Sequence, residues 1–309
     1  MAKPRNDLYD RLQYLALRMF TMMLHTWPVE LNLMGARLCG DIMYYLDKRH
    51  RDRAMHNLKR SFPGIADDVA RRVCRHSMRQ FFTLGVEILF TTRLIKIPTI
   101  ARYIELDFIR PVLELLLKRN QGVLMLTGHY GNWEILGYFF ATLGFETTSI
   151  ARPIDNPYIN KWLLGVREHM GQRIIAKSGA THEVLDVLRN GGAVGLIADQ
   201  NAGPKGIFVD FFGRKASTYK SIGLLAMEFN APVIVGYARR MGKGFKFRIG
   251  MSDLIWPEDW KDKPDPLKYI TQRYTTAIEK FIREEPGQYL WIHRRWKTRP
   301  KGEEPEKYD

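Results

Sequence analysis

The chain has 309 residues, of which 45% are hydrophobic, so it can bury a sizeable core and is not a disordered protein. Lysine and arginine number 48 against 33 aspartates and glutamates, which gives a net charge of +15. A surplus of this size indicates an anionic partner, and at this point nucleic acid, a membrane surface and an acidic carrier protein all remain open.

The first expected element is an amphipathic helix at residues 8–24. Its apolar side chains cover a wide arc, and its polar side chains share a stripe of about 100° at the 3.6-residue helical period. Arg11 and Arg18 lie in that stripe, so the segment lacks the run of about 20 apolar residues that a spanning helix needs. We therefore expect a helix that lies in the membrane interface, and a mostly buried helix of the domain is the alternative.

Two basic runs follow, at residues 48–60 and 71–79. They favour the membrane interpretation because anionic headgroups attract each nearby Lys or Arg by about 1 kcal/mol, although a solvated helix face would have the same composition. These patterns predict an N-terminal membrane-associating helical segment over residues 1–47 and a globular domain over residues 48–309.

From residue 122 onward, short apolar runs alternate with helical patterns, which is typical of an α/β domain with a central mixed sheet flanked by helices. The first 120 residues, by contrast, have a helical pattern, with one helix expected from Asp67 to near Phe90. Strands are expected at residues 122–126, 147–151, 173–176, 193–198, 207–211, 232–238 and 245–249. Helices are expected at residues 112–118, 133–143, 156–170, 181–189, 218–229 and 265–284.

The segment GHYGNWE at residues 128–134 follows the first of these strands and starts a helix. Ligand-binding and catalytic groups of α/β sheets collect just beyond the carboxyl ends of strands, where His129 is expected. Asn132 is suited to cap the helix and would place Glu134 in its first turn, so that His129 and Glu134 can face one crevice. A histidine in that place can act as a general base. The alternative is structural, since the helix dipole alone favours a carboxylate in the first turn.

Other motifs are missing from the sequence. No HExxH zinc motif occurs, and the two cysteines, Cys39 and Cys74, match no metal-binding spacing. The sequence also lacks GxxxxGK[ST] and has no GxGxxG after a strand. We therefore expect neither a metal ion nor a nucleotide cofactor.

GHYGNWE resembles the His-x4-Asp/Glu signature of acyltransferases, in the form used by the bacterial lipid A late acyltransferases, which are lauroyl and myristoyl transferases. Further segments resemble blocks of that family in the same order, and the resemblance covers roughly residues 8 to 300. One His-x4-Glu is unspecific, but five ordered blocks are much more so. The other four blocks are ARPIDNPYIN, REHMGQRIIAK, GGAVGLIADQNAGPKGIFVDFFGRKAST and QYLWIHRRWKTRP.

The resemblance implies a glycerolipid acyltransferase-like fold and an enzyme on the cytoplasmic face of a bacterial inner membrane. Such an enzyme moves a fatty acyl chain from acyl carrier protein, or from acyl-CoA, to a hydroxyl of a lipid A-type glycolipid without a cofactor. The expected partners are the carrier protein, the glycolipid and the anionic membrane surface, and nucleic acid is not among them.

The resemblance also assigns roles to residues. It makes His129 the general base on the acceptor hydroxyl and Glu134 its partner. Asp199 ends another predicted strand, so it can lie beside His129 and hold the imidazole. Its structural alternative is a turn residue in Asp-Gln-Asn-Ala-Gly, a composition that favours a turn in any case.

Basic residues in the matching blocks are candidates for charge stabilisation. Arg167 is expected to stabilise the tetrahedral intermediate, with phosphate or headgroup anchoring or a plain ion pair as its alternatives. Arg152 is expected to bind substrate, with headgroup anchoring or a plain ion pair as alternatives. Asn132 is also assigned to substrate binding. Arg214 and Lys215 are expected to meet an acceptor phosphate or the acidic carrier, and a solvated loop pair is their alternative.

One departure from the family concerns its usual N-terminal hydrophobic anchor. Arg11 and Arg18 interrupt the corresponding stretch, which favours monotopic or peripheral attachment over a spanning helix. Two other functions remain open. The chain could acylate another glycolipid, such as a mannosylated phosphatidylinositol, or a lysophospholipid. It could also be a non-enzymatic basic membrane-binding protein.

Overall fold

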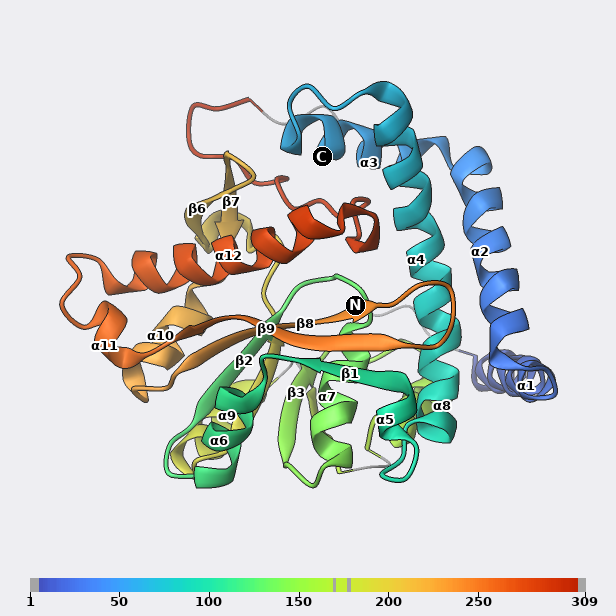
Figure 1. The fold of residues 1–309 in the computed structure, drawn as a ribbon, viewed down its shortest axis with the longest axis horizontal. Coiled ribbons are helices and arrows are strands. Elements are labelled where there is room, and N and C mark those ends of the chain that lie inside the picture. Colours follow the sequence, from blue (N-terminus) through green and yellow to red (C-terminus); the bar gives the residue numbers. More distant parts are fainter. Residues whose placement is uncertain (1–5, 169–170, 177–178, 305–309) are drawn as a thin grey trace.

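The computed structural model describes residues 6–168, 171–176 and 179–304. Its centre is a seven-stranded sheet with the order β1-β9-β8-β2-β5-β3-β4 (Figure 1). Neighbouring strands are parallel except for β8 with β9, so the expected mixed α/β sheet is confirmed. The strands are β1 (Ile104–Asp107), β2 (Val123–Thr127), β3 (Thr147–Ala151), β4 (Arg173–Ala176), β5 (Ala193–Ile197), β8 (Val233–Arg240) and β9 (Phe247–Ile255).

Helices cover both faces of this sheet because the side chains of its strands alternate between two cores. In β2, Val123 packs into the core that contains α7, whereas Leu124 packs into the core that contains α12. The helices on the first face are α6 (Arg110–Lys118) and α7 (Trp133–Thr142). The helices on the second face are α9 (Ala180–Arg189), α10 (Lys220–Glu228) and α12 (Pro266–Glu284).

A separate antiparallel hairpin corrects one expectation. Residues 207–211 form a strand, but that strand pairs with β7 outside the central sheet. The short strands β1 and β7 were not expected, because the polar residues within them interrupt the apolar run that marks a strand. The remaining elements are β6 (Ile207–Phe211), β7 (Arg214–Thr218), α5 (Ile100–Tyr103), α11 (Pro257–Trp260), and the 3-10 helices Gly203–Lys205 and Pro286–Gln288.

The N-terminal third is helical, as expected, and α2 lies along α4 (Figure 1). Gly40 allows this close approach, since a Cβ there would lie 2.4 Å from the Cα of Arg79. Leu33 of α2 is fully buried in the domain core. Residues 29–46 therefore share that core. The helices of this region are α1 (Asp7–His25), α2 (Val29–Leu46), α3 (Lys48–Ser61) and α4 (Asp67–Leu94). Helix α1 also contacts α8 (Pro157–Glu168).

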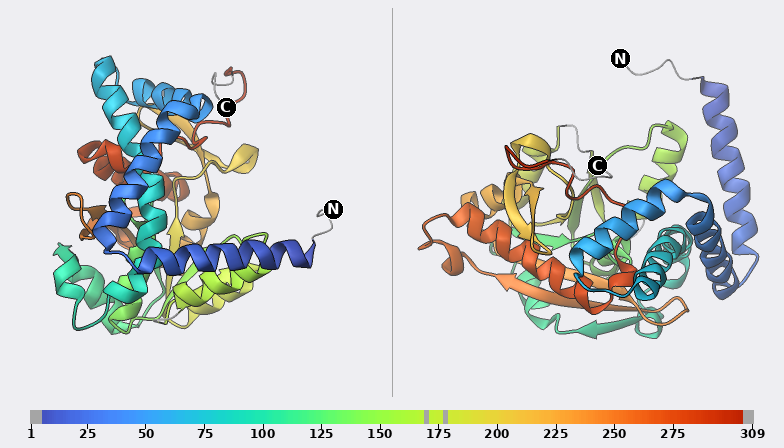
Figure 2. Two further views of the ribbon diagram at one scale, coloured as in Figure 1. Left: turned by 90° about the vertical axis from the view of Figure 1, so that its right-hand side faces the viewer. Right: turned by 90° about the horizontal axis from the view of Figure 1, so that it is seen from above.

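Helix α1 lies beside α8 (Figure 2). Hydrogen bonds show that the polar stripe of α1 faces α8. The Tyr158 hydroxyl donates to an Asp7 carboxylate oxygen at 2.7 Å and accepts from Arg11 Nε at 2.9 Å. The Asn156 side-chain amide donates to the Asp10 carbonyl at 2.9 Å. These bonds fix which side of α1 faces away from the domain.

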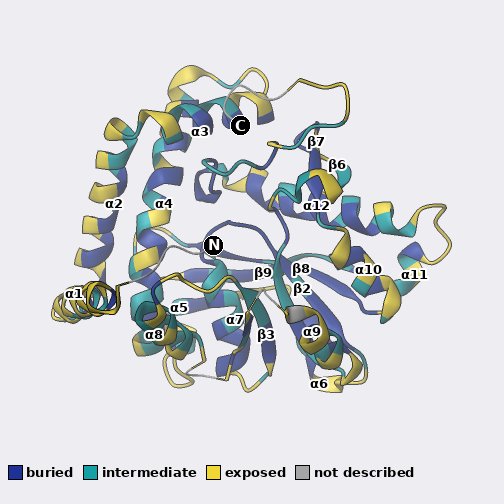
Figure 3. Ribbon diagram, turned by 180° about the vertical axis from the view of Figure 1, so that it is seen from behind, coloured by how far each residue is buried: buried dark blue, intermediate teal, exposed yellow. Residues whose placement is uncertain are grey.

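The opposite side of α1 and the outer side of α2 expose large apolar side chains. Exposed residues of these helices are yellow in Figure 3. We call this surface the apolar face of α1 and α2. None of the helices in the described ranges combines the length and the apolar character needed to cross a membrane. The side chains of this face are Leu8, Leu12, Leu15, Met19, Phe20, Met22, Met23, Trp27, Leu31, Met34, Leu38, Ile42 and Leu46.

Candidate active site

His129 and Asp199 meet at the carboxyl edge of the sheet, just after the neighbouring strands β2 and β5. These strands pair in parallel up to Thr127 and Ile197, so the residues that follow them emerge side by side. The Asp199 carboxylate binds His129 Nδ1 at 2.8 Å with one oxygen and accepts the His129 backbone N–H at 2.9 Å with the other. Both residues are buried. The expectation that Asp199 lies beside His129 is therefore confirmed.

The electrostatics of this pair favour an ionised Asp199. Burial alone raises the pKa of a carboxyl group. Here the electrostatic attraction of His129, together with the hydrogen bonds that His129 donates to Asp199, outweighs burial and lowers the pKa of Asp199. A carboxylate at Nδ1 holds the proton on that nitrogen and leaves Nε2 with a lone pair. The imidazole is thus oriented to accept a proton from another group at Nε2.

Two aromatic rings hold the His129 ring in place. The Trp133 ring lies 5.0 Å from it and the His293 ring 4.2 Å from it, measured between centroids. Burial, followed by the nearby His129, lowers the pKa of His293 to about 4, so His293 is neutral at pH 7. The sequence reasoning missed His293, although it lies in the block QYLWIHRRWKTRP, because no spacing connects it to residue 129.

Glu134 lies in the first turn of α7, as predicted, but its partner is Arg167 of α8. Arg167 Nε and Nη2 donate to the two Glu134 carboxylate oxygens at 2.9 and 2.7 Å. Both side chains are 20% exposed, so the pair is neither fully solvated nor sealed. The resemblance implied that Glu134 is the partner of His129, but in the structure Asp199 contacts the imidazole and Glu134 contacts Arg167.

Asn132 is a structural residue of the loop that carries His129. Its side-chain oxygen accepts the Ile135 N–H at 3.1 Å, which confirms the predicted helix cap. Its amide donates to Glu87 of α4 at 2.9 Å, and Asn132 is fully buried. Glu87 in turn pairs with Arg240 of β8 inside the protein. With both ends of its side chain bonded within the protein, Asn132 is placed to shape the loop.

The same loop is held by its backbone. Gln80 of α4 donates to the Gly131 carbonyl at 2.8 Å. Gly131 has a φ of +56°, and a Cβ there would lie 1.9 Å from the Ala238 carbonyl oxygen. Only glycine fits that conformation and that approach. The turn between His129 and Glu134 is therefore fixed by contacts with α4 and β8.

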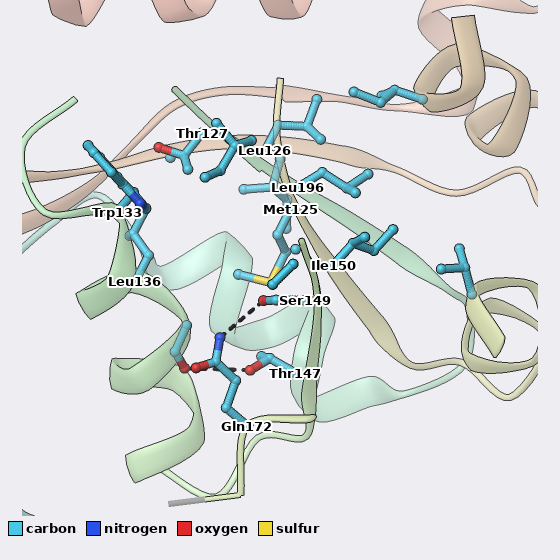
Figure 4. Close-up of a pocket in the computed structure, with 18 of the residues that line it drawn as sticks. Met125, Leu126, Thr127, Trp133, Leu136, Thr147, Ser149, Ile150, Gln172 and Leu196 are labelled. Carbon is cyan, nitrogen blue, oxygen red and sulfur yellow. Dashed lines mark hydrogen bonds between the residues drawn. The ribbon is translucent and has the colours of Figure 1, made fainter. Parts of the chain in front are cut away.

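A cavity of about 1020 Å³ opens next to the His129–Asp199 pair. Thr127 and Trp133, which lie in its wall, are neighbours of His129. This volume is at the upper end of the roughly 300–1,000 Å³ usual for ligand pockets. Strand β3 pairs with β5 only as far as Ser149 and Gly195. Residues from both faces of the sheet line the cavity. Figure 4 shows its predominantly apolar wall. Apolar lining residues include Val112, Met125, Leu136, Phe140, Ile150, Leu196, Ile222 and Leu225.

The other predicted binding residues divide into two groups. Arg152, Glu134 and Arg167 line the cavity. Arg214 instead lies buried over the Trp296 ring at 3.5 Å, and Lys215 pairs with Asp210 on the surface of the β6–β7 hairpin. The structure therefore brings Arg152 to the site but does not bring Arg214 or Lys215 to the cavity wall.

Nearly the whole chain is similar in sequence to proteins of known activity. Residues 4–298 match the family model described as bacterial lipid A biosynthesis acyltransferase. The chain is 26% identical to the lipid A biosynthesis lauroyltransferase of Escherichia coli K12, over 85% of this chain and 84% of that protein. It is also 26% identical to the lipid A biosynthesis palmitoleoyltransferase of the same organism, over 90% and 88%. The phosphatidylinositol mannoside acyltransferase of Mycobacterium tuberculosis is 25% identical over 44% of this chain and 45% of its own.

Proposed function

Since the chain belongs to the bacterial lipid A biosynthesis acyltransferase family, we propose that it transfers a fatty acyl chain from a thioester donor to a hydroxyl group of a lipid A-type glycolipid. Like its relatives, the protein is an acyltransferase. The observation that carries the detailed proposal is the His129–Asp199 pair beside an apolar cavity of about 1020 Å³.

In this proposal His129 is the general base. Its Nε2 takes the proton of the acceptor hydroxyl while that oxygen attacks the thioester carbonyl carbon. Asp199 keeps the proton on Nδ1 and stabilises the imidazolium that forms. The tetrahedral intermediate then collapses, the carbon–sulfur bond breaks, and the imidazolium returns its proton to the leaving thiolate. The products are the ester and the free thiol.

The two arginines of the cavity wall fit the charges of this reaction. Glu134 holds the Arg167 guanidinium through two hydrogen bonds, so Arg167 is positioned in advance rather than mobile. We assign Arg167 to the developing oxyanion and Glu134 to the positioning of Arg167. Arg152 is exposed at the cavity, which suits a phosphate group of the acceptor.

The donor in this proposal is acyl carrier protein, and acyl-CoA is the alternative. In either case the acyl chain enters the apolar cavity and the thioester remains beside His129. Burial of the chain would supply binding energy of about 0.8 kcal/mol per CH₂ group. The net charge of +15 supports association with an acidic carrier as well as with an anionic membrane.

The test of the proposed function is a reconstituted transfer assay. The purified protein is mixed with one acyl chain carried either on acyl carrier protein or on CoA, and with a lipid A precursor that has a free hydroxyl. We expect mass spectrometry to detect the acylated precursor, formed faster from the carrier protein. If product formed only when a mannosylated phosphatidylinositol or a lysophospholipid was offered, that lipid would replace the lipid A precursor as the proposed acceptor. A complete lack of ester product would contradict the reaction.

We further propose that the apolar face of α1 and α2 attaches the enzyme to the cytoplasmic face of the inner membrane, without spanning it. Contiguous exposed apolar surface marks an interaction site, and the polar contacts of α1 with α8 turn its apolar side outward. An interfacial helix also carries basic residues on its polar side, as Arg11 and Arg18 do here.

Introducing charge into this face is expected to weaken membrane binding. Leu12 and Met19 are 56% and 67% exposed, and each would insert an apolar side chain worth about 1.5–3 kcal/mol. The double variant Leu12→Glu/Met19→Glu should bind vesicles of phosphatidylethanolamine and phosphatidylglycerol at least about tenfold more weakly by co-sedimentation. The matched control is Ile97→Glu/Leu117→Glu, at sites 69% and 70% exposed but outside these helices. Equal binding by both double variants would show that this face does not contact the membrane.

A further inference from the structure

Two polar side chains meet in the wall of the largely apolar cavity. Gln172 Nε2 donates to Ser149 Oγ at 3.0 Å, and Gln172 is only 6% exposed (Figure 4). We propose that this pair, the Gln172–Ser149 stop, sets the greatest length of acyl chain that the cavity accepts. The inference rests on the acyl transfer proposed above and adds a determinant of donor specificity to it.

The strands fix how deep the stop lies. His129 follows the carboxyl end of β2, whose last residue, Thr127, pairs with Ile197. Ser149 pairs with Gly195, which is two residues earlier in the same strand. At about 3.3 Å per residue, Ser149 therefore lies roughly 7 Å farther from the reacting edge than Thr127 does. Gln172 directly precedes β4, which places it at the far, amino-terminal edge of these parallel strands.

The neighbouring backbone closes around the pair. A Cβ at position 137 of α7 would lie 2.2 Å from Gln172 Nε2, and a Cβ at position 195 of β5 would lie 3.0 Å from Ser149 Oγ. Both positions are glycine, so the protein leaves just enough space there for the Gln172 and Ser149 side chains. An arriving hydrocarbon chain therefore meets side chains that are backed by α7 and β5.

Hydrocarbon and polar groups are a poor match at this point. A methyl group that reaches the stop covers an amide and a hydroxyl without offering either a hydrogen bond, and this loss weakens binding roughly tenfold. A shorter acyl chain ends before the stop, so it leaves the two polar groups uncovered and their mutual hydrogen bond in place. The stop thus disfavours long acyl chains and has no effect on how the thioester group is recognised.

The test is a competition between donors of different length. Equimolar acyl carrier protein thioesters with chains of 8 to 18 carbons are offered together, and mass spectrometry measures the distribution of products. We expect Gln172→Leu to raise the ratio of long to short products roughly tenfold, with a smaller shift in the same direction for Ser149→Ala. The matched control is Gln121→Leu, the same chemical change at a residue that precedes β2 and is not among the described lining residues. It should keep the wild-type distribution.

A second measurement separates this inference from the proposed function. Displacement of a fluorescent fatty acid by free fatty acids of 8 to 18 carbons reports chain length without any transfer, so it remains informative even if the wild type forms no ester. Wild-type length profiles for folded Gln172→Leu and Ser149→Ala, in binding and in transfer, would overturn the stop. A wild-type preference for chains hydroxylated at this depth over plain chains of equal length would also overturn it, because the pair would then recognise a hydroxyl.

Discussion

Replacing His129 with alanine is expected to lower the rate of acyl transfer by about 10²–10⁴-fold, the usual contribution of a general base. The hydroxyl of the acceptor is a weak nucleophile until a positioned base removes its proton. In this protein Asp199 fixes the imidazole, and Trp133 and His293 pack against its ring. The measurement is the initial rate of ester formation at saturating donor, followed by mass spectrometry.

Two further variants make this prediction specific. Asp199→Asn keeps the shape of the side chain but removes the charge that stabilises the imidazolium, so transfer should fall by a comparable factor. In the His129→Ala background the same change should cost little, because residues that act as a unit are not additive. His182→Ala, at an exposed position on α9, is the matched control and should retain wild-type activity. Full activity of folded His129→Ala would refute the assignment of the base.

Removing the buried carboxylate of Glu87 is expected to lower the free energy of unfolding by about 3–5 kcal/mol. Glu87 is fully buried and pairs with Arg240, which is 8% exposed. Glu87→Ala leaves the Arg240 guanidinium inside the protein without its counter-ion and also removes a partner of Asn132. Denaturant unfolding followed by circular dichroism measures the change.

The comparison with an exposed ion pair shows whether burial is the cause. Glu114 and Arg110 form a pair on α6 whose side chains are 52% and 89% exposed. Glu114→Ala should therefore change the free energy of unfolding by less than about 1 kcal/mol. Replacing both Glu87 and Arg240 with apolar residues should recover part of the lost stability, since no buried charge then remains. Equal losses for Glu87→Ala and Glu114→Ala would contradict this account.

Much of the fold could be predicted because its central elements have regular patterns. The strands at residues 147–151 and 173–176 have the predicted bounds, and the helix expected at residues 265–284 begins one residue later. Short apolar runs in a parallel sheet are buried on both faces, so they stand out in the sequence. The loop at His129 was also predictable, because Gly131 and Asn132 have strong local preferences for turns and helix caps.

The remainder depends on contacts between distant segments. Asp199 and Glu134 are both acidic residues near the ends of strands or helices, and only the pairing of β2 with β5 shows which of them reaches His129. His293 is 164 positions away from His129 by their residue numbers, so no sequence period links them. Arg214 was a candidate phosphate ligand because it is a basic residue in a block that resembles the family, yet it is buried against Trp296.

The contacts between α1 and α8 also bear on how this enzyme can be shortened for study. Trimming the chain to start after His25 would remove the part of the apolar face that lies on α1 and leave the part that lies on α2. It would also leave Tyr158 without Asp7 and Asn156 without the Asp10 carbonyl. Both lost bonds are at the start of α8, and the same helix ends with Arg167 in the cavity wall. The shortened protein would therefore expose less apolar surface, but the helix that places Arg167 in the cavity wall would be loosened.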